Sequence, residues 1–228
     1  MFIAGNIAKI EEQIQMACNK AGRERSEITL MGVSKFIPIN LIKEAHLAGI
    51  HCFGESRVKE AAEKFAGFKD ECETQLHLIG SLQRNKAKQA ALLFDCIQSV
   101  DRDELITELA KHSLQRSLPL DVLLELHTGE ETKSGYENLD ALFKAAEIVL
   151  ENKGLRPIGL MTMAPYTKDE KPIRASFRQL VNAQKELEKR FPNGGYWNCL
   201  SMGMSNDFEI AIEEGSNLLR IGSAIFKE

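Results

Sequence analysis

The stretch Ile28-Thr29-Leu30-Met31-Gly32-Val33-Ser34-Lys35 is apolar or small at nearly every position until it reaches a lysine. A strand with water on one face alternates apolar and polar residues, whereas a strand covered on both faces is apolar at consecutive positions. The stretch therefore predicts a buried strand over 28–34 in a parallel sheet, with Lys35 where that strand ends.

Seven more such runs follow, and helical patterns separate them. The predicted strands are 28–34, 50–53, 76–79, 95–99, 120–126, 156–161, 197–201 and 218–221. Apolar residues three and four positions apart predict helices near 6–21, 38–48, 56–66, 84–92, 102–115, 138–152, 169–190 and 206–214. This alternation predicts the α/β class and a single (β/α)8 TIM-type barrel, whose extra N-terminal helix covers the seam. An open parallel sheet is the alternative.

Composition limits the classes of protein. The chain has 228 residues and 43% apolar residues, which suits one domain over 1–228 with a sizeable core. Its net charge of -4 gives no general attraction for nucleic acid or an anionic membrane. Five scattered cysteines, none in a C-x-x-C pair, are typical of a reducing compartment. We see no signal peptide and no apolar run of the roughly 20 residues that cross a bilayer, so we expect a cytoplasmic protein.

Polar and small residues gather where the predicted strands end. The carboxyl ends of all strands of such a barrel face one mouth, and that face holds the active site. The residues that follow the strands are Lys35, 54–56, 77–80, 99–101, 127–129, 161–165, 201–205 and 220–223. Random placement would scatter them over both ends of the barrel, so the sequence predicts a site at this mouth.

Lys35 is the candidate nucleophile. No acidic residue lies within four positions of it. Desolvation without a counter-charge lowers the pKa of a lysine, and the neutral amine attacks carbonyl carbons. The alternative is an ordinary lysine whose stem packs while its ammonium reaches water.

Two small-residue turns near the other end of the chain are candidate phosphate sites. They are 201–205, which contains Ser201, Gly203 and Ser205, and 222–224, which begins with Gly222 and Ser223. Glycine lets the backbone approach an anion, and loops after strands seven and eight of barrels commonly bind phosphate. A helix cap at Ser205 or Asp207 is the alternative for the first turn. A carbonyl site beside a phosphate site indicates pyridoxal phosphate.

Arg220 lies two positions before Gly222 on the last strand, so the two positions point the same way. Arginine only donates hydrogen bonds, and it therefore discourages protonation of a ring nitrogen that it faces. An unprotonated pyridine is a weak electron sink, which disfavours most amino-acid chemistry. A salt bridge from Arg220 to Glu213 or Glu214 is the alternative.

The histidines do not indicate a metal. Residues 46, 51, 77, 112 and 127 lack zinc-ligand spacing, and we expect His77 to be a hydrogen-bonded core imidazole. The run Arg84, Lys86, Lys88 is expected to be a solvated helix face. The spacing of the serines, histidines and acids defines no Ser-His-Asp arrangement, and there is no G-x-S-x-G motif.

Several segments together resemble the pyridoxal phosphate homeostasis protein family, whose fold resembles the N-terminal barrel of alanine racemase (PLP fold type III). They are 33–35, 53–55, 77–86, 99–101, 131–135, 159–163, 200–205 and 219–226. The resemblance implies an internal aldimine of pyridoxal 5'-phosphate on Lys35 and an arginine, Arg220, that faces the ring nitrogen. It also implies phosphate contacts from Ser201, Gly222 and Ser223, with Ser205 as a further contributor. Ser56 and His127 depart from the family, which usually has Asn there, and this bears on the tuning of the cofactor.

The function expected is a non-catalytic binder that stores or delivers pyridoxal phosphate and limits the free aldehyde. We expect a monomer that meets cofactor-dependent apo-enzymes transiently. One alternative is an amino-acid racemase, although such racemases add a second domain that supplies a tyrosine base, and this chain has only Tyr136, Tyr166 and Tyr196. The other alternative is a lysine aldolase that acts directly on a phosphorylated sugar.

Overall fold

A computed structural model describes residues 2–129, 134–194 and 196–227, apart from the side chain of Asp70. Eight parallel strands follow one another around a closed barrel, and β8 pairs with β1. The strands are β1 (Thr29–Val33), β2 (Cys52–Glu55), β3 (Gln75–Leu78), β4 (Cys96–Val100), β5 (Leu120–Glu125), β6 (Leu155–Met161), β7 (Cys199–Met204) and β8 (Leu218–Ile221). The predicted barrel is confirmed, and the open sheet is wrong.

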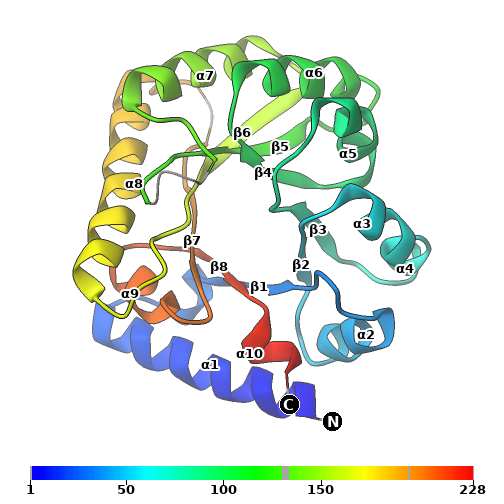
Figure 1. Ribbon diagram of the computed structural model, residues 1–228, viewed down its shortest axis with the longest axis vertical. Coiled ribbons are helices and arrows are strands. Elements are labelled where there is room, and N and C mark those ends of the chain that lie inside the picture. Colours follow the sequence, from blue (N-terminus) through cyan, green and yellow to red (C-terminus); the bar gives the residue numbers. More distant parts are fainter. Residues whose placement is uncertain (1, 130–133, 195, 228) are drawn as a thin grey trace.

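Helices surround the strands in a ring (Figure 1). They are α1 (Phe2–Ala21), α2 (Ile39–Leu47), α3 (Val58–Phe65), α4 (Phe68–Glu71), α5 (Ala87–Leu93), α6 (Asp103–Ser113), α7 (Leu139–Glu151), α8 (Glu170–Arg190), α9 (Phe208–Glu213) and α10 (Ser223–Phe226). Two 3-10 turns, η1 (Arg25–Glu27) and η2 (Arg84–Lys86), precede β1 and α5. The sequence did not predict α4, α10 or η1. It placed 84–92 in one helix that the structure divides between η2 and α5.

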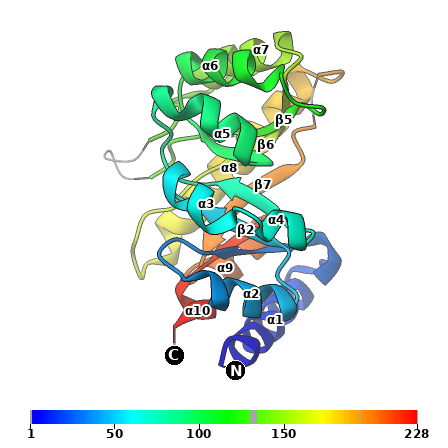
Figure 2. The same cartoon turned by 90° about the vertical axis from the view of Figure 1, so that its right-hand side faces the viewer.

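The N-terminal helix covers the seam of the barrel, as predicted. Helix α1 packs against α2, α9 and α10, because α10 has only four residues and leaves that side of β8 and β1 open. The side-chain amide of Asn6 donates hydrogen bonds to the carbonyls of Ile225 (3.1 Å) and Lys227 (2.9 Å). The two ends of the chain consequently lie at the same end of the molecule (Figures 1 and 2).

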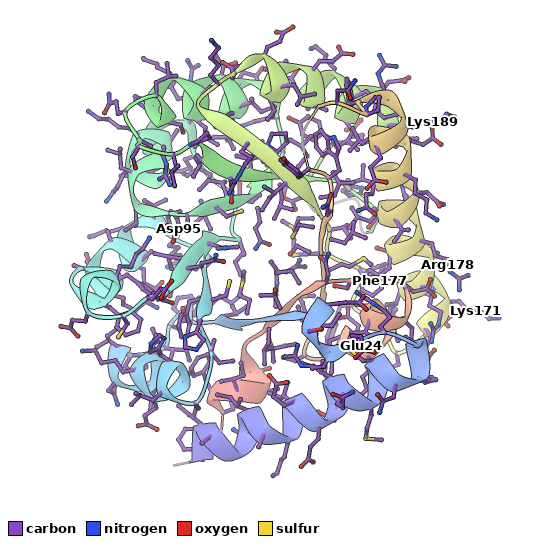
Figure 3. The ribbon with its side chains drawn as sticks, turned by 180° about the vertical axis from the view of Figure 1, so that it is seen from behind. Glu24, Asp95, Lys171, Phe177, Arg178 and Lys189 are labelled. Atoms are coloured by element: carbon purple, nitrogen blue, oxygen red, sulfur yellow. The ribbon has the colours of Figure 1, made fainter. Side chains whose placement is uncertain are left out.

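The main apolar core lies between the strands and the helices. Helix α8 illustrates how the helices contribute to it: Phe177 is buried on its inner side, whereas Lys171, Arg178 and Lys189 point outward (Figure 3). Burial of such apolar stripes is the dominant favourable term in folding. Within the described residues, no helix has the length and apolarity needed to span a membrane.

The interior of the barrel is filled separately. Two small apolar clusters, centred on Met31, Cys52 and Leu218 and on Cys96, Leu123 and Met161, occupy part of it. Buried polar side chains occupy another part, and they are His77, Gln98, Ser201 and Arg220. A packed interior of this kind leaves the strand ends as the place for a site.

Candidate functional site

Lys35 lies two residues after the end of β1, in the turn that carries the chain to α2. Its side chain is exposed, and in the described part of the chain no hydrogen bond or ion pair occupies its ammonium. The sequence analysis expected the Lys35 side chain to be desolvated, and this expectation is wrong, because the turn places Lys35 beyond the buried end of the strand. The amine is instead accessible to a molecule that enters the mouth.

The turn after β8 lies directly beside the end of β1. Gly32 is paired with Ile221 in the sheet, so Gly222 comes opposite Val33. A Cβ at Gly222 would stand 3.3 Å from both the Cβ and the carbonyl oxygen of Val33. The fold thus brings Gly222 within two residues of Lys35 in the neighbouring strand.

Two candidate phosphate residues, which follow β7 and β8, come together here. The hydroxyl of Ser223 donates to the hydroxyl of Ser205 at 3.3 Å, and Ser223 is exposed. Ser223 and Ala224 are the first residues of α10, where backbone N–H groups lack partners within the helix. Hydroxyl and N–H donors of this kind can bind a phosphate oxygen.

The structure corrects the predicted roles of Ser201 and Gly203. Strand β7 runs on to Met204, so both residues lie inside the strand and not in a turn. Gly203 has φ of +97°, and a Cβ there would come within 2.6 Å of the Cβ of Ala211. This glycine therefore allows α9 to pack on β7, and the anion approach inferred for it is wrong. Ser201 is fully buried in the barrel interior, where its hydroxyl is already engaged.

Arg220 is buried in the barrel interior and bound to the neighbouring strands. Its Nη1 donates to the carbonyl oxygen (2.6 Å) and the hydroxyl (2.7 Å) of Ser201, and its Nη2 donates to the carbonyl oxygen of Thr162 (2.7 Å). A guanidinium has five N–H groups. Among the described residues three are used, so two remain for another acceptor.

The proposed salt bridge of Arg220 to Glu213 or Glu214 is wrong. Those carboxylates pair on the outer surface with Lys20, Arg174 and Arg178. Burial lowers the pKa of Arg220 to about 10, against the opposing effect of Asp207 and Glu125. The guanidinium therefore stays protonated at neutral pH and keeps acting as a donor.

A hydrogen-bond chain crosses the barrel from Arg220 to His77. Because Arg220 only donates, the hydroxyl of Ser201 accepts from it and donates onward to Oε1 of Gln98 (2.6 Å). The amide nitrogen of Gln98 then faces Nδ1 of His77 at 2.9 Å and donates to it. His77 is thus a neutral imidazole with its proton on Nε2, and burial lowers its pKa to about 4.

Gln98 was missed by the sequence analysis. It is fully buried in β4, between Ile97 and Ser99. A glutamine inside a buried strand is a signal, because such a polar group requires partners. Its partners come from β3 and β7, however, and nothing in the sequence shows which strands those are.

Other candidate residues have plain structural positions. Ser56 and His127 follow β2 and β5 at the mouth, and their backbones contact Gly80 and Tyr136 respectively. Within the resembling segment 131–135, residues 131–133 lie outside the described residues. Among the described residues, no three His, Cys, Asp or Glu side chains group as a metal site would require.

A cavity of about 630 Å³ opens at the opposite end of the barrel, where the strands begin. It is lined in part by Thr29, Ile50, His51 and Gln75. Neither Lys35 nor Arg220 lines it, and barrel sites form at the carboxyl ends of strands. We therefore place the candidate site at the mouth that carries Lys35.

The fold and the mouth residues define a barrel of the type described as alanine racemase, N-terminal domain, a family that matches residues 6–228. The chain belongs to the pyridoxal phosphate homeostasis protein family. A family member from Aquifex aeolicus is 39% identical, over 97% of this chain and 96% of its own. One from Escherichia coli K12 is 37% identical, over 98% and 95%.

A solved structure supports the same grouping. PipY of Synechococcus elongatus PCC7942, with PLP bound, has 30% sequence identity and a TM-score of 0.86, and the match covers 98% of this chain and 99% of PipY.

Proposed function

We propose that this protein binds pyridoxal 5'-phosphate covalently through Lys35 and acts in homeostasis of that cofactor, storing or delivering it without catalysing a reaction. The relatives named above support the cofactor and its homeostasis. The observation that carries the proposal is the buried guanidinium of Arg220, which uses only three of its five N–H donors among the described residues, while the amine of Lys35 is exposed.

The residues present fit this cofactor. Lys35 offers a free amine to its aldehyde, and Gly222, which lies against Val33, brings the turn after β8 close to that amine. Ser205, Ser223 and the first N–H groups of α10 would hold the phosphate. We withdraw Ser201 from the phosphate contacts and assign it to the support of Arg220.

The non-catalytic role follows from the charge of Arg220. When bound, the cofactor supplies an aldehyde and a pyridine ring that can accept electrons once its nitrogen is protonated. Arg220 stays charged and donates, so it opposes a proton on a nitrogen that it faces. The site therefore favours retention of the aldehyde over carbanion chemistry.

We further propose that the chain works as one domain in the cytoplasm, as a monomer, and that cofactor-dependent apo-enzymes receive the cofactor from it. The exposure of Lys35 supports hand-over, because a receiving protein or water can reach its amine.

Borohydride labelling tests the covalent link. The protein is incubated with pyridoxal phosphate, reduced and digested, and the labelled peptide is identified by mass spectrometry. Wild type should carry one label, on Lys35. Lys35→Ala should carry none, whereas Lys59→Ala, which removes another exposed lysine, should label normally. Label elsewhere in wild type, or retained in Lys35→Ala, would overturn the assignment.

The absence of catalysis has a separate test. Incubation of the loaded protein with L-alanine in deuterium oxide reports exchange at Cα. We expect exchange far slower than the rates of about 1 per second or more that are typical of enzymes. Exchange at such rates would contradict the non-catalytic role and support the racemase alternative.

A further inference from the structure

The turn that carries Lys35 has an unusual backbone. Phe36 has φ of +63° and is the non-glycine residue with positive φ among those described. A bulky side chain rarely adopts that conformation unless surrounding contacts impose it. The contacts that surround this turn therefore impose its conformation.

Lys64, from α3, reaches the main chain on both sides of Lys35. Its ammonium donates to the carbonyl oxygen of Ser34 at 2.7 Å and lies 3.4 Å from that of Ile37. The same ammonium pairs with Glu55 (2.6 Å) and Glu60 (2.9 Å). A lysine has three N–H donors, so Ser34 and the two carboxylates use all of them.

The two carboxylates bind the turn as well. Oε1 of Glu60 accepts from the backbone N–H of Phe36 at 2.7 Å. Oε1 of Glu55, which is fully buried, accepts from the hydroxyl of Ser34 at 2.7 Å. We call Glu55, Glu60 and Lys64 the turn clamp. It bonds to Ser34 and Phe36 and approaches Ile37, so Lys35 is the one residue of the turn that it leaves free.

A plain stabilising ion pair does not account for this arrangement. Lys64 and Glu60 are four residues apart on α3 and could pair without touching the turn. A buried ion pair is moreover weak evidence for stability, because desolvation offsets the attraction. Here the donors and acceptors converge on the backbone that flanks Lys35. Geometry of that kind orients a group more than it stabilises a fold.

We infer that Lys64 is a positioning residue: by holding the Lys35 turn, it fixes where the Lys35 amine is presented and so slows the loss of the bound cofactor. The inference rests on the proposed function. Covalent capture joins Nζ to the aldehyde carbon by a C=N bond and expels the carbonyl oxygen as water; release adds that water back and frees the amine. A loose turn lets Nζ leave its place, and orientation is worth large factors in rate and equilibrium.

Three variants test the inference. Lys64→Met keeps the stem and removes the donors, Lys64→Arg restores donors, and Lys59→Met on the exposed face of α3 is the matched control. Release of pyridoxal phosphate from loaded protein is followed by its visible band after dilution. We expect Lys64→Met to release it about 10-fold faster or more, Lys64→Arg to recover part of the loss, and Lys59→Met to behave as wild type.

Hydrogen exchange of the cofactor-free protein gives a second readout. The Phe36 amide, which Glu60 accepts, should exchange faster in Lys64→Met and not in Lys59→Met, at equal melting temperatures or after correction for their difference. Unchanged exchange over 34–37 together with unchanged release would overturn the inference. If wild type takes up no cofactor, the proposed function fails, and exchange alone still decides whether Lys64 holds the turn.

A second pair covers the case that Lys64→Met does not fold. Glu60→Ala removes the acceptor of the Phe36 N–H, and Glu63→Ala removes an exposed carboxylate from the same helix. Glu60→Ala should raise exchange at Phe36 and speed release, and Glu63→Ala should change neither. Equal behaviour of the two variants would overturn the inference.

Discussion

The guanidinium of Arg220 donates to the hydroxyl of Ser201 at 2.7 Å inside the barrel, and that hydroxyl in turn donates a hydrogen bond to Oε1 of Gln98. The bond joins the last strand to β7 and, through Gln98, to the opposite wall. A residue expected to bind phosphate therefore supports Arg220, the residue that we propose to face the cofactor ring. The orientation of Arg220 depends on a chain of buried partners and not on the site alone.

Ser201→Ala should loosen Arg220. The variant leaves Oε1 of Gln98 without its donor and removes one of the three acceptors of Arg220, which costs about 1–3 kcal/mol of unfolding free energy. The visible spectrum of bound pyridoxal phosphate should change as well. Ser113→Ala removes another buried hydroxyl, bonded to Leu109 within α6, and should leave that spectrum unchanged. Denaturant titration and absorbance give both quantities, and identical spectra for the two variants would contradict the support role.

The strands were predictable because consecutive apolar residues mark both-faced burial, and every predicted strand overlaps an observed one. The short helices α4 and α10 were not, since four residues hold too little periodicity to show a pattern. Residues 201–205 were read as a turn because Ser and Gly favour turns. Strand β7 instead continues to Met204, with a register shift against β8 between Ser201 and Met204, and α9 packs beside Gly203. These contacts are tertiary.

The position of the candidate site could be predicted in part from the sequence. The sequence places Lys35, Arg220 and Gly222 at strand ends, and the closed barrel gathers strand ends at one mouth. The sequence does not specify the left-handed backbone of Phe36, next to the exposed Lys35, nor the turn clamp of Glu55, Glu60 and Lys64. Both depend on residues that are distant in sequence and met only in the folded chain.

Replacement of Arg220 should alter the ring. Arg220→Glu exchanges a donor for an acceptor, so a ring nitrogen beside it should become protonated and Cα exchange of added amino acids should rise above wild type. A carboxylate in this buried place costs about 3–5 kcal/mol of unfolding free energy, so circular dichroism must first show that the variant is folded. Arg178→Glu, on the outer surface, is the comparison. Unchanged spectra and exchange in folded Arg220→Glu would exclude the contact with the ring.

His77 should make stability depend on pH. Its folded pKa of about 4 lies below the unfolded value of about 6.5, so the unfolded chain binds more protons between these values. The contribution of neutral His77 to the free energy of unfolding is therefore fully present above pH 6.5. It is lost as the pH drops toward 4, by about 3 kcal/mol in total. His77→Gln keeps an acceptor for Gln98 and does not titrate, so its decline over this range should be smaller by that amount. Denaturant midpoints at several pH values measure it, and parallel declines would refute the assignment.

Alanine should destabilise the fold more at Gly203 than at Gly222. At Gly203, with φ of +97° and Ala211 only 2.6 Å from the added Cβ, alanine should cost about 2–4 kcal/mol of unfolding free energy. At Gly222, φ is -116° and the nearest atoms of Val33 stand at 3.3 Å, so the cost should be about 1 kcal/mol or less.

Affinity for pyridoxal phosphate should show the reverse order. The methyl group at Gly222 stands beside the end of β1 that leads to Lys35, and it should weaken binding about 10-fold, as should Ser223→Ala, which removes a hydroxyl donor. Gly203→Ala, studied at a temperature where it is folded, should bind as wild type, because its side of β7 faces α9. Titration followed by absorbance measures each affinity. Normal binding by both Gly222→Ala and Ser223→Ala would remove the phosphate from the turn after β8 and require another anion site at the mouth.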